Sequence, residues 1–228
     1  MQNDDTHNEN ISLYRKVMHS SSISQLLYRN CLQKTVQVPT SRKKWEGSFS
    51  EISNEDWKQI YKAPWCSVTE ARIIYFQFKF IHRIVPTNRL LSLMGKVDSP
   101  LCTFCAIHDE SLDHLFWDCP YTSSFILDTE GRILNRQFFL SKKDFFFGYI
   151  HDITHPYNFL IFHMKSYIYD CKRKDCKPMI DEFVLKFKFA LSVEKYICSK
   201  KETRNKKKVD FAQLYEVFSS ICPELFFE

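Results

Sequence analysis

The sequence predicts an all-α fold. Of its 228 residues, 44% are hydrophobic and 16% are aromatic, which provides ample apolar surface for a core in one large domain or two small ones. Only four residues are glycine, and long stretches contain no residue that interrupts a helix. Because sandwiches and barrels need frequent turn residues, their shortage here favours a helical assembly.

The first third of the chain predicts two helices separated by a linker. Residues 1–10 are polar, and a helix is expected from Ile11 to about Gln33. Residues 35–50 contain a proline and a run of three basic residues, and we interpret them as a linker or extended segment. A short helix is expected to open at Ser53.

The next segment carries clear helix boundaries. Ser67 and Glu70 form a capping-box pattern, in which each side chain can satisfy a free amide at the start of a helix. The helix that they open is long and apolar, and we expect it to end at Pro86. Thr87 can cap a second helix over residues 88–94, and the glycine after it is placed as a left-handed stop.

The remainder of the chain also continues as helix. Helices are expected over residues 121–134, 156–172, 178–200 and 210–227, the last one ended or kinked near its proline. We divide the chain into three regions: residues 1–44, an N-terminal helix and linker; residues 45–125, the helical pair and the loop that follows it; and residues 126–228, a basic helical region.

Four residues in that loop form a metal-binding pattern. Cys102, Cys105, His114 and Cys119 have the spacing C-x2-C-x8-H-x4-C. Thiolates together with one imidazole are the ligands that tetrahedral Zn²⁺ prefers, and a closed set of four leaves no position for water. The pattern therefore predicts a small loop with a structural Cys-Cys-His-Cys zinc site, around which the helices assemble.

The second half of this pattern raises a geometric difficulty. In a straight helix, His114 and Cys119 would lie about 140° apart around the axis, too far to share one face. Pro120 disfavours helical geometry at the cysteine before it, so the chain can swing that sulfur back toward the metal. Two alternatives stay open. The thiols can be buried without metal beside a core histidine, or His108 can replace His114 as the nitrogen ligand, although three ligands would then crowd into one turn.

The amino terminus and the cysteines bear on the cellular compartment. Residues 1–5 lack the pattern of a secretory signal, and no apolar run reaches membrane-spanning length, because His163 and Lys165 interrupt the best candidate. We expect an intracellular protein, in the nucleus or the cytoplasm, with no membrane partner. In a reducing compartment, nine cysteines favour metal ligation for the clustered set over disulfides. The remaining six offer no second ligand set.

Positive charge is concentrated toward the carboxyl-terminal half. Residues 165–208 contain fourteen Lys or Arg and six Asp or Glu, a net charge of +8, whereas the whole chain carries +5. Such a field attracts phosphate backbones and predicts RNA or DNA as the partner. Alternatively, the run is a solvated helical face, and residues 206–208 also fit a short nuclear import signal. The candidate nucleic-acid contacts are Arg83, Lys172, Arg173, Lys174, Lys177, Lys206, Lys207 and Lys208.

Several short segments carry a family resemblance. They are WKQIY at residues 57–61, FQFKFIHRIVPTN at 76–88, SPLCTFC at 99–105 and HLFWDC at 114–119, followed by residues 158–160, 165–169 and 194–197. Over roughly Trp45 to Cys198, the chain resembles the zinc-binding region downstream of reverse transcriptase in polyproteins of LINE-type, non-LTR retrotransposons. The resemblance implies that the Cys-Cys-His-Cys set binds zinc. It also implies a region that helps hold element RNA or target DNA during target-primed reverse transcription.

The catalytic features of such polyproteins are missing from the sequence. A polymerase site needs an aromatic-Ala-Asp-Asp pair of carboxylates, and the only Asp-Asp here is Asp4-Asp5 in a polar tail. A related downstream nuclease needs Pro-Asp and a distant acid-x-Lys around a divalent metal, and no Pro-Asp occurs. The chain also has no room for an endonuclease domain, so it resembles a detached or truncated fragment. We expect no enzyme and no small-molecule substrate.

Three functional classes follow. The leading one is a zinc-stabilised nucleic-acid-binding module, in which Phe104, Trp117 or Tyr121 could stack on bases. The second is a zinc-pinned protein-interaction module that docks onto a reverse transcriptase domain encoded elsewhere. The third is a non-functional relic of a retroelement.

Overall fold

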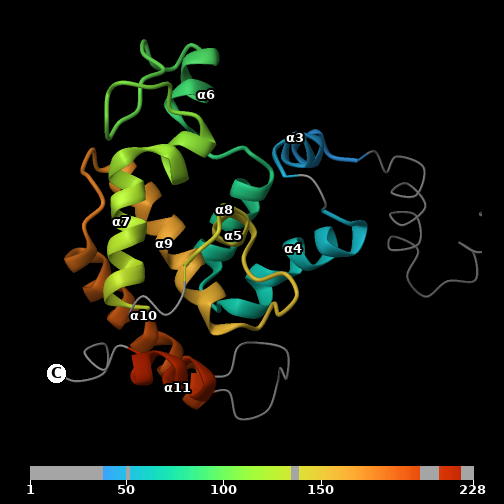
Figure 1. Cartoon of the computed structure of the whole chain (residues 1–228), viewed down its shortest axis with the longest axis vertical. Coiled ribbons are helices and arrows are strands. Elements are labelled where there is room, and N and C mark those ends of the chain that lie inside the picture. Colours follow the sequence, from blue (N-terminus) through green and yellow to red (C-terminus); the bar gives the residue numbers. More distant parts are fainter. Residues whose placement is uncertain (1–37, 50–51, 135–138, 201–210, 222–228) are drawn as a thin grey trace, which may run out of the picture. The chain divides into compact units, whose positions relative to one another are not determined.

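The computed structural model describes residues 38–49, 52–134, 139–200 and 211–221, and its regular elements are helices (Figure 1). The chain divides into two compact units, residues 1–43 and 44–228. No strand forms among the described residues, where an isolated bridge pairs Leu101 with Asp109. The prediction of a mainly helical protein is confirmed for this part of the chain. The elements are α3 (Thr40–Ser48), α4 (Asn54–Ser67), α5 (Ala71–Ile81), α6 (Asn88–Leu93), η1 (His114–Asp118), α7 (Pro120–Arg132), α8 (Lys142–Phe147), α9 (Pro156–Arg173), α10 (Ile180–Lys200) and α11 (Phe211–Ile221).

The segment predicted as a linker contains helix α3, so that prediction is wrong. Its basic residues at 42–44 lie on the helix, and the tryptophan that follows them is completely buried. The indole Nε1 of Trp45 donates a hydrogen bond to Ile81 O at 2.7 Å. A charged run next to one buried aromatic residue suits a short amphipathic helix, but it gives too few positions for a clear period. The helix expected over residues 11–33 lies outside the described residues, and the division into three regions stays a prediction.

The capping box lies one helix earlier than the sequence pattern predicts. At the start of α4, Asp56 N donates to Ser53 Oγ at 3.1 Å, and Ser53 N donates to Asp56 Oδ2 at 2.9 Å. Ser67 instead ends α4, where its hydroxyl donates to Ala63 O at 2.8 Å. Glu70 precedes α5 without forming a side-chain cap. Both places carry a serine followed three residues later by an acid, so the local pattern alone does not distinguish them.

The other helix boundaries agree more closely with the sequence. The hydroxyl of Thr87 accepts from Leu90 N at the start of α6, and Gly95 after this helix has the left-handed φ of 64° expected of a stop. Helices α7, α9 and α10 begin and end within two residues of their predicted bounds. Helix α5 is the exception: it ends at Ile81 and not at Pro86 as predicted, and Arg83 just beyond it adopts a left-handed φ of 55°.

Helix α9 is the central element of the unit formed by residues 44–228. It packs against α4, α5, α10 and α11 and buries most of its side chains. The chain after α8 turns at Gly148, where φ is 81° and an added Cβ would lie 2.5 Å from Asn158 Oδ1. Helix α6 and the loop after it lie at one end of this unit, and α11 lies at the other (Figure 1). None of the described helices is long and apolar enough to cross a membrane.

A lysine is enclosed among the aromatic rings of this core. Lys165 on α9 is fully buried, and its amine donates to Phe146 O at 2.8 Å. The same amine lies 4.7 Å from the ring centroid of Phe80 and 4.9 Å from that of Phe162. Ring faces and the carbonyl favour the charged form, but burial dominates and lowers the pKa of Lys165 well below its usual range.

Replacing this lysine by methionine is expected to stabilise the fold. In the unfolded chain the amine of Lys165 keeps its proton up to about pH 10.4. In the folded chain the amine loses its proton at a lower pH, so between the folded and the unfolded pKa the unfolded chain binds more protons. The free energy of unfolding should therefore rise with pH over that window in the parent chain and lose this slope in Lys165→Met. At pH 7 the variant should gain about 1 kcal/mol or more, measured by urea unfolding between pH 6 and 10.

Lys195→Met, at an exposed lysine on α10, serves as the control and should keep the slope. An unchanged slope in Lys165→Met would show that the buried amine does not titrate differently in the folded chain.

Candidate metal centre

The first two cysteines lie on a tight turn between α6 and η1. Ala106 N donates to Cys102 O at 2.8 Å, and Cys102 N donates to His108 O at 2.8 Å. Ala106 adopts a φ of 53°, the left-handed conformation that lets the chain reverse directly after Cys105. This turn places both sulfurs in one group with the side chains of His114, on η1, and Cys119, directly after it.

The other two members of the set are joined by a π-helical turn. Cys119 N donates to His114 O at 2.8 Å, the bond between residues five apart that defines such a turn. A π turn is wider than an α turn, so it removes the angular mismatch that a straight helix would impose on His114 and Cys119. Cys119 itself is extended, with φ −67° and ψ 129°, and Pro120 begins α7. The prediction that the cysteine before Pro120 leaves helical geometry is confirmed.

The four candidate ligand atoms converge on one point. They all lie within 4.8 Å of one another, with 3.9 Å between the sulfurs of Cys102 and Cys119 and 3.3 Å between Cys105 Sγ and His114 Nε2. In a tetrahedral site with Zn–S of about 2.3 Å and Zn–N of about 2.0 Å, the ligand atoms lie about 3.5 to 3.8 Å apart. The group therefore fits Zn²⁺. His108 is exposed and lies outside the group.

Hydrogen bonds and burial shift the pKa values of the group in different directions. The hydrogen bond between the two thiols raises the pKa of Cys102, aided by burial, and lowers the pKa of Cys119. Backbone amides at the start of α7 further lower the pKa of Cys119, and Phe104 N donates to Cys102 Sγ at 3.4 Å. Burial, followed by the neighbouring His108, lowers the pKa of His114, which favours the neutral imidazole that a metal requires. A bound cation would displace the remaining thiol protons.

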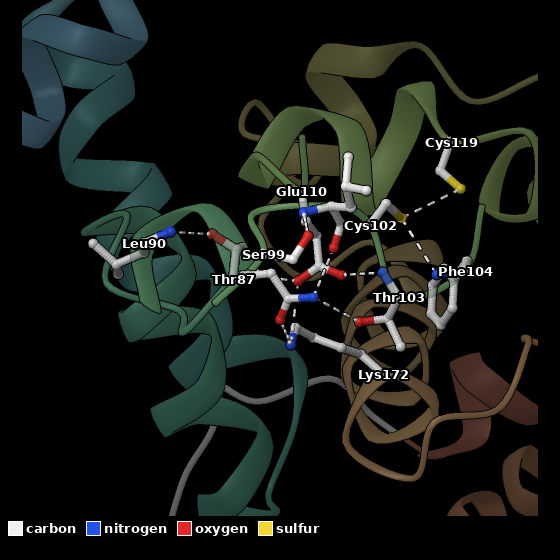
Figure 2. A network of polar contacts seen from close by, with 11 residues as sticks. Thr87, Leu90, Ser99, Cys102, Thr103, Phe104, Glu110, Cys119 and Lys172 are labelled. Carbon is white, nitrogen blue, oxygen red and sulfur yellow. Dashed lines mark hydrogen bonds and ion pairs between the residues drawn. The ribbon is translucent and has the colours of Figure 1, made fainter. Parts of the chain in front are cut away.

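A buried carboxylate anchors this loop to the rest of the unit (Figure 2). Glu110 is fully buried, and its two oxygens accept from Asn88 N and Thr103 N, each at 2.8 Å. Lys172 Nζ lies 3.2 Å from the same carboxylate and donates to Asn88 Oδ1 at 2.9 Å. Glu110 therefore joins the start of α6, the cysteine turn and the end of α9. Sequence analysis did not single out Glu110, because it lies in a short polar stretch, residues 108–111, with no local pattern that marks it.

A second ion pair fixes η1. Arg83 Nη2 lies 2.8 Å from Asp113 Oδ2, and its guanidinium lies over the indole of Trp45 at 4.1 Å from the ring centroid. Lys142 Nζ reaches Asp118 Oδ1 at 3.1 Å from the start of α8. The loop of residues 99–119, called the metal loop below, is thus tied by ion pairs to α9 through Glu110, to Arg83 through Asp113 and to α8 through Asp118.

The predicted nucleic-acid contacts fall into three groups. Lys172, only 10% exposed in its side chain, and Arg83 are engaged in the internal ion pairs just described. Arg173, Lys174 and Lys177 are exposed at the end of α9 and just beyond it. Residues 206–208 lie outside the described residues. Of the predicted stacking residues, Phe104 is buried, Trp117 packs on Phe145 and Phe146, and Tyr121 is exposed.

These features together define a candidate zinc-binding module, in which a closed Cys/His group is held between short helices. Residues 39–125, which include all four members of the group, match a family model described as zinc-binding in reverse transcriptase. The resemblance drawn from the sequence is confirmed at this level for that part of the chain. The matched family describes zinc binding and not catalysis. Searches of curated proteins and of solved structures found no match.

Proposed function

We propose that this chain is a zinc-stabilised nucleic-acid-binding module derived from the region downstream of the reverse transcriptase of a LINE-type, non-LTR retrotransposon. In this role Cys102, Cys105, His114 and Cys119 hold a structural zinc ion that fixes the loop. The folded chain then helps hold template RNA or target DNA during target-primed reverse transcription, while catalysis takes place on other domains. The chain acts inside the cell, in the nucleus or the cytoplasm.

The observation that carries the proposal is a basic cluster beside the metal loop, formed by Arg173, Lys174 and Lys177. The ammonium of Lys177 lies 3.8 Å from the ring centroid of Tyr121, two residues after the last member of the metal group. Lys172 on the same helix end is paired with Glu110 inside the loop. Three exposed basic residues therefore lie at and just beyond the helix end that is tied to this loop, with Arg173 also 3.7 Å from Asp170 Oδ1, an arrangement suited to phosphates.

Removing this charge is expected to weaken nucleic-acid binding in a salt-dependent way. Each phosphate contact contributes about 0.7 to the slope of log affinity against log salt for single strands. The double variant Arg173→Gln/Lys174→Gln should bind a labelled RNA or DNA strand about tenfold less tightly at low salt, with a slope shallower by about 1.4. Fluorescence anisotropy of the zinc-loaded chain between 50 and 200 mM salt measures both.

The matched control removes the same charge elsewhere. Lys195→Gln/Lys200→Gln alters two exposed lysines on α10 and should leave the affinity close to that of the parent chain. Equal losses in both double variants would mean that net charge alone governs binding. No binding of the parent chain to RNA or DNA would reject the proposed function.

A protein-docking role is the second candidate, favoured by exposed apolar side chains at the end of the unit that carries the metal loop. Leu93 at the end of α6, Met94 directly after it and Ile107 in the cysteine turn are all largely exposed. Such residues can contact a reverse transcriptase domain encoded elsewhere. A pull-down of that domain that survives nuclease treatment would support this role.

A further inference from the structure

Helix α5 carries aromatic residues on two opposite sides. Its buried side places Phe76 and Phe80 in the core. On the other side, Tyr75 and Phe78 recur at helical spacing with their side chains in solvent, 60% and 48% exposed. An amphipathic helix of this kind normally places polar residues there, so exposed rings call for a partner.

A row of rings extends from the exposed side of α5 to α4, with His82 and Tyr61 part-buried between its exposed ends. The rings of Tyr75 and Phe78 are nearly parallel, at 7° with 6.5 Å between centroids. His82 follows at 4.3 Å from Phe78 and stacks on Tyr61 of α4 at 5.6 Å. Trp65 lies one turn beyond Tyr61 on the same side of α4 and is 64% exposed. We call these five residues the aromatic row.

The net charge of the segment that carries the aromatic row is positive. Residues 57–84 contain five Lys or Arg and one acid, Glu70, and three of the basic residues, Lys58, Arg72 and Arg83, form ion pairs with acids. The ammonium of Lys79 lies 4.5 Å from the ring centroid of Tyr75, and Lys62 is exposed one residue after Tyr61. Burial lowers the pKa of His82, so its ring is neutral at pH 7 and adds no repulsion to a stack. Rings next to ammonium groups suit a ligand that offers both flat faces and negative charge.

A single nucleic-acid strand has this chemistry. Its unpaired bases can stack on protein rings, and its phosphates can contact lysines, whereas a duplex keeps its base faces stacked inside. A second copy of the chain would bring the same positive charge against itself. Complementarity of charge therefore favours a polyanion over self-association.

We propose that the aromatic row binds single-stranded RNA or DNA by stacking its bases. The inference rests on the proposed function and specifies it: the zinc-ordered chain prefers unpaired strands, with the basic cluster contacting phosphates and the aromatic row contacting bases.

The test compares the affinity for a single strand with that for a duplex of the same length. In the zinc-loaded chain, Tyr75→Ala/Phe78→Ala should weaken binding to a 12-nucleotide oligo(U) or oligo(dT) at least tenfold and change duplex binding less than about twofold. The conservative pair Tyr75→Phe/Phe78→Tyr should retain the parent affinity. Leu185→Ala/Phe189→Ala, at exposed apolar residues of α10, is the matched control and should leave both affinities unchanged. Quenching of Trp65 fluorescence by the strand, lost in Trp65→Phe, reports contact directly.

The outcomes separate the two proposals. If the parent chain binds no nucleic acid, the proposed function fails and this inference with it. If the parent chain binds but Tyr75→Ala/Phe78→Ala keeps the parent ratio of single-strand to duplex affinity, the proposed function stands and the inference is overturned. Self-association of the parent chain that the same pair abolishes, without a change in strand binding, would assign the aromatic row to a second copy and also overturn it.

Discussion

Loss of zinc is expected to unfold the loop between α6 and α7. Within residues 99–119 the regular structure is limited to an isolated bridge and one π-helical turn, so the loop depends on the Cys/His group together with the Glu110 contacts. Binding energy at a structural zinc site acts as folding energy, because the unfolded chain has no preformed site. Cys119→Ser should lower the zinc content from about one ion per chain to none and reduce the free energy of unfolding by about 3 kcal/mol or more.

Zinc analysis by mass spectrometry and hydrogen exchange over residues 99–119 measure these effects. Cys176→Ser is the matched control, because Cys176 is a part-buried free thiol outside the group, and it should keep both zinc and protection. His108→Ala should also keep zinc, since its ring lies outside the group. A parent chain that is folded, protected in this loop and free of zinc would identify the group as packed thiols.

Removing the Glu110 carboxylate is expected to be nearly as damaging. Glu110→Ala would leave the enclosed ammonium of Lys172 without its counter-charge and two part-buried amides, those of Asn88 and Thr103, without an acceptor. Breaking a buried ion pair from one side costs about 3 to 5 kcal/mol, because the remaining charge stays desolvated. Chemical unfolding measures the loss, and zinc affinity should fall with it because Thr103 lies between two members of the metal group.

A comparison of a single and a double variant shows whether the unpaired ammonium of Lys172 causes the loss of stability. Glu110→Gln/Lys172→Met removes both charges and should be more stable than Glu110→Gln alone, because no unpaired ammonium remains. Glu55→Ala, which breaks an exposed pair with Lys58, should leave stability nearly unchanged. If Glu110→Ala behaved like that exposed variant, the buried link between the loop and α9 would have to be abandoned.

The sequence predicted the elements that depend on local pattern. Helices α9 and α10 are long segments with recurring apolar residues and no glycine or proline after the first residue of either. Thr87 and Gly95 bound α6 through local backbone geometry that a few neighbouring residues determine. The Cys/His spacing likewise singled out the residues that the structure brings together, although whether they bind zinc stays a prediction.

What the sequence did not reveal depends on contacts between distant segments. The hydroxyl of Ser67 donates to Ile153 O at 2.8 Å, 86 residues away, which local capping rules do not foresee. The count of basic residues in the sequence made Lys172 and Arg83 candidate phosphate contacts, whereas in the structure they form ion pairs with Glu110 and Asp113. The aromatic row was missed because exposed and buried rings alternate on α5, and the sequence shows only a generally apolar helix.

The π-helical turn of η1 makes the position of the Cys119 sulfur depend on the number of residues between His114 and Cys119. The hydrogen bond from Cys119 N to His114 O needs four residues between its ends. A deletion of one residue there would restore an ordinary helical repeat and change the direction of the thiolate relative to the imidazole. Insertions or deletions in this stretch are therefore expected to separate the four candidate ligand atoms even when every donor residue is retained.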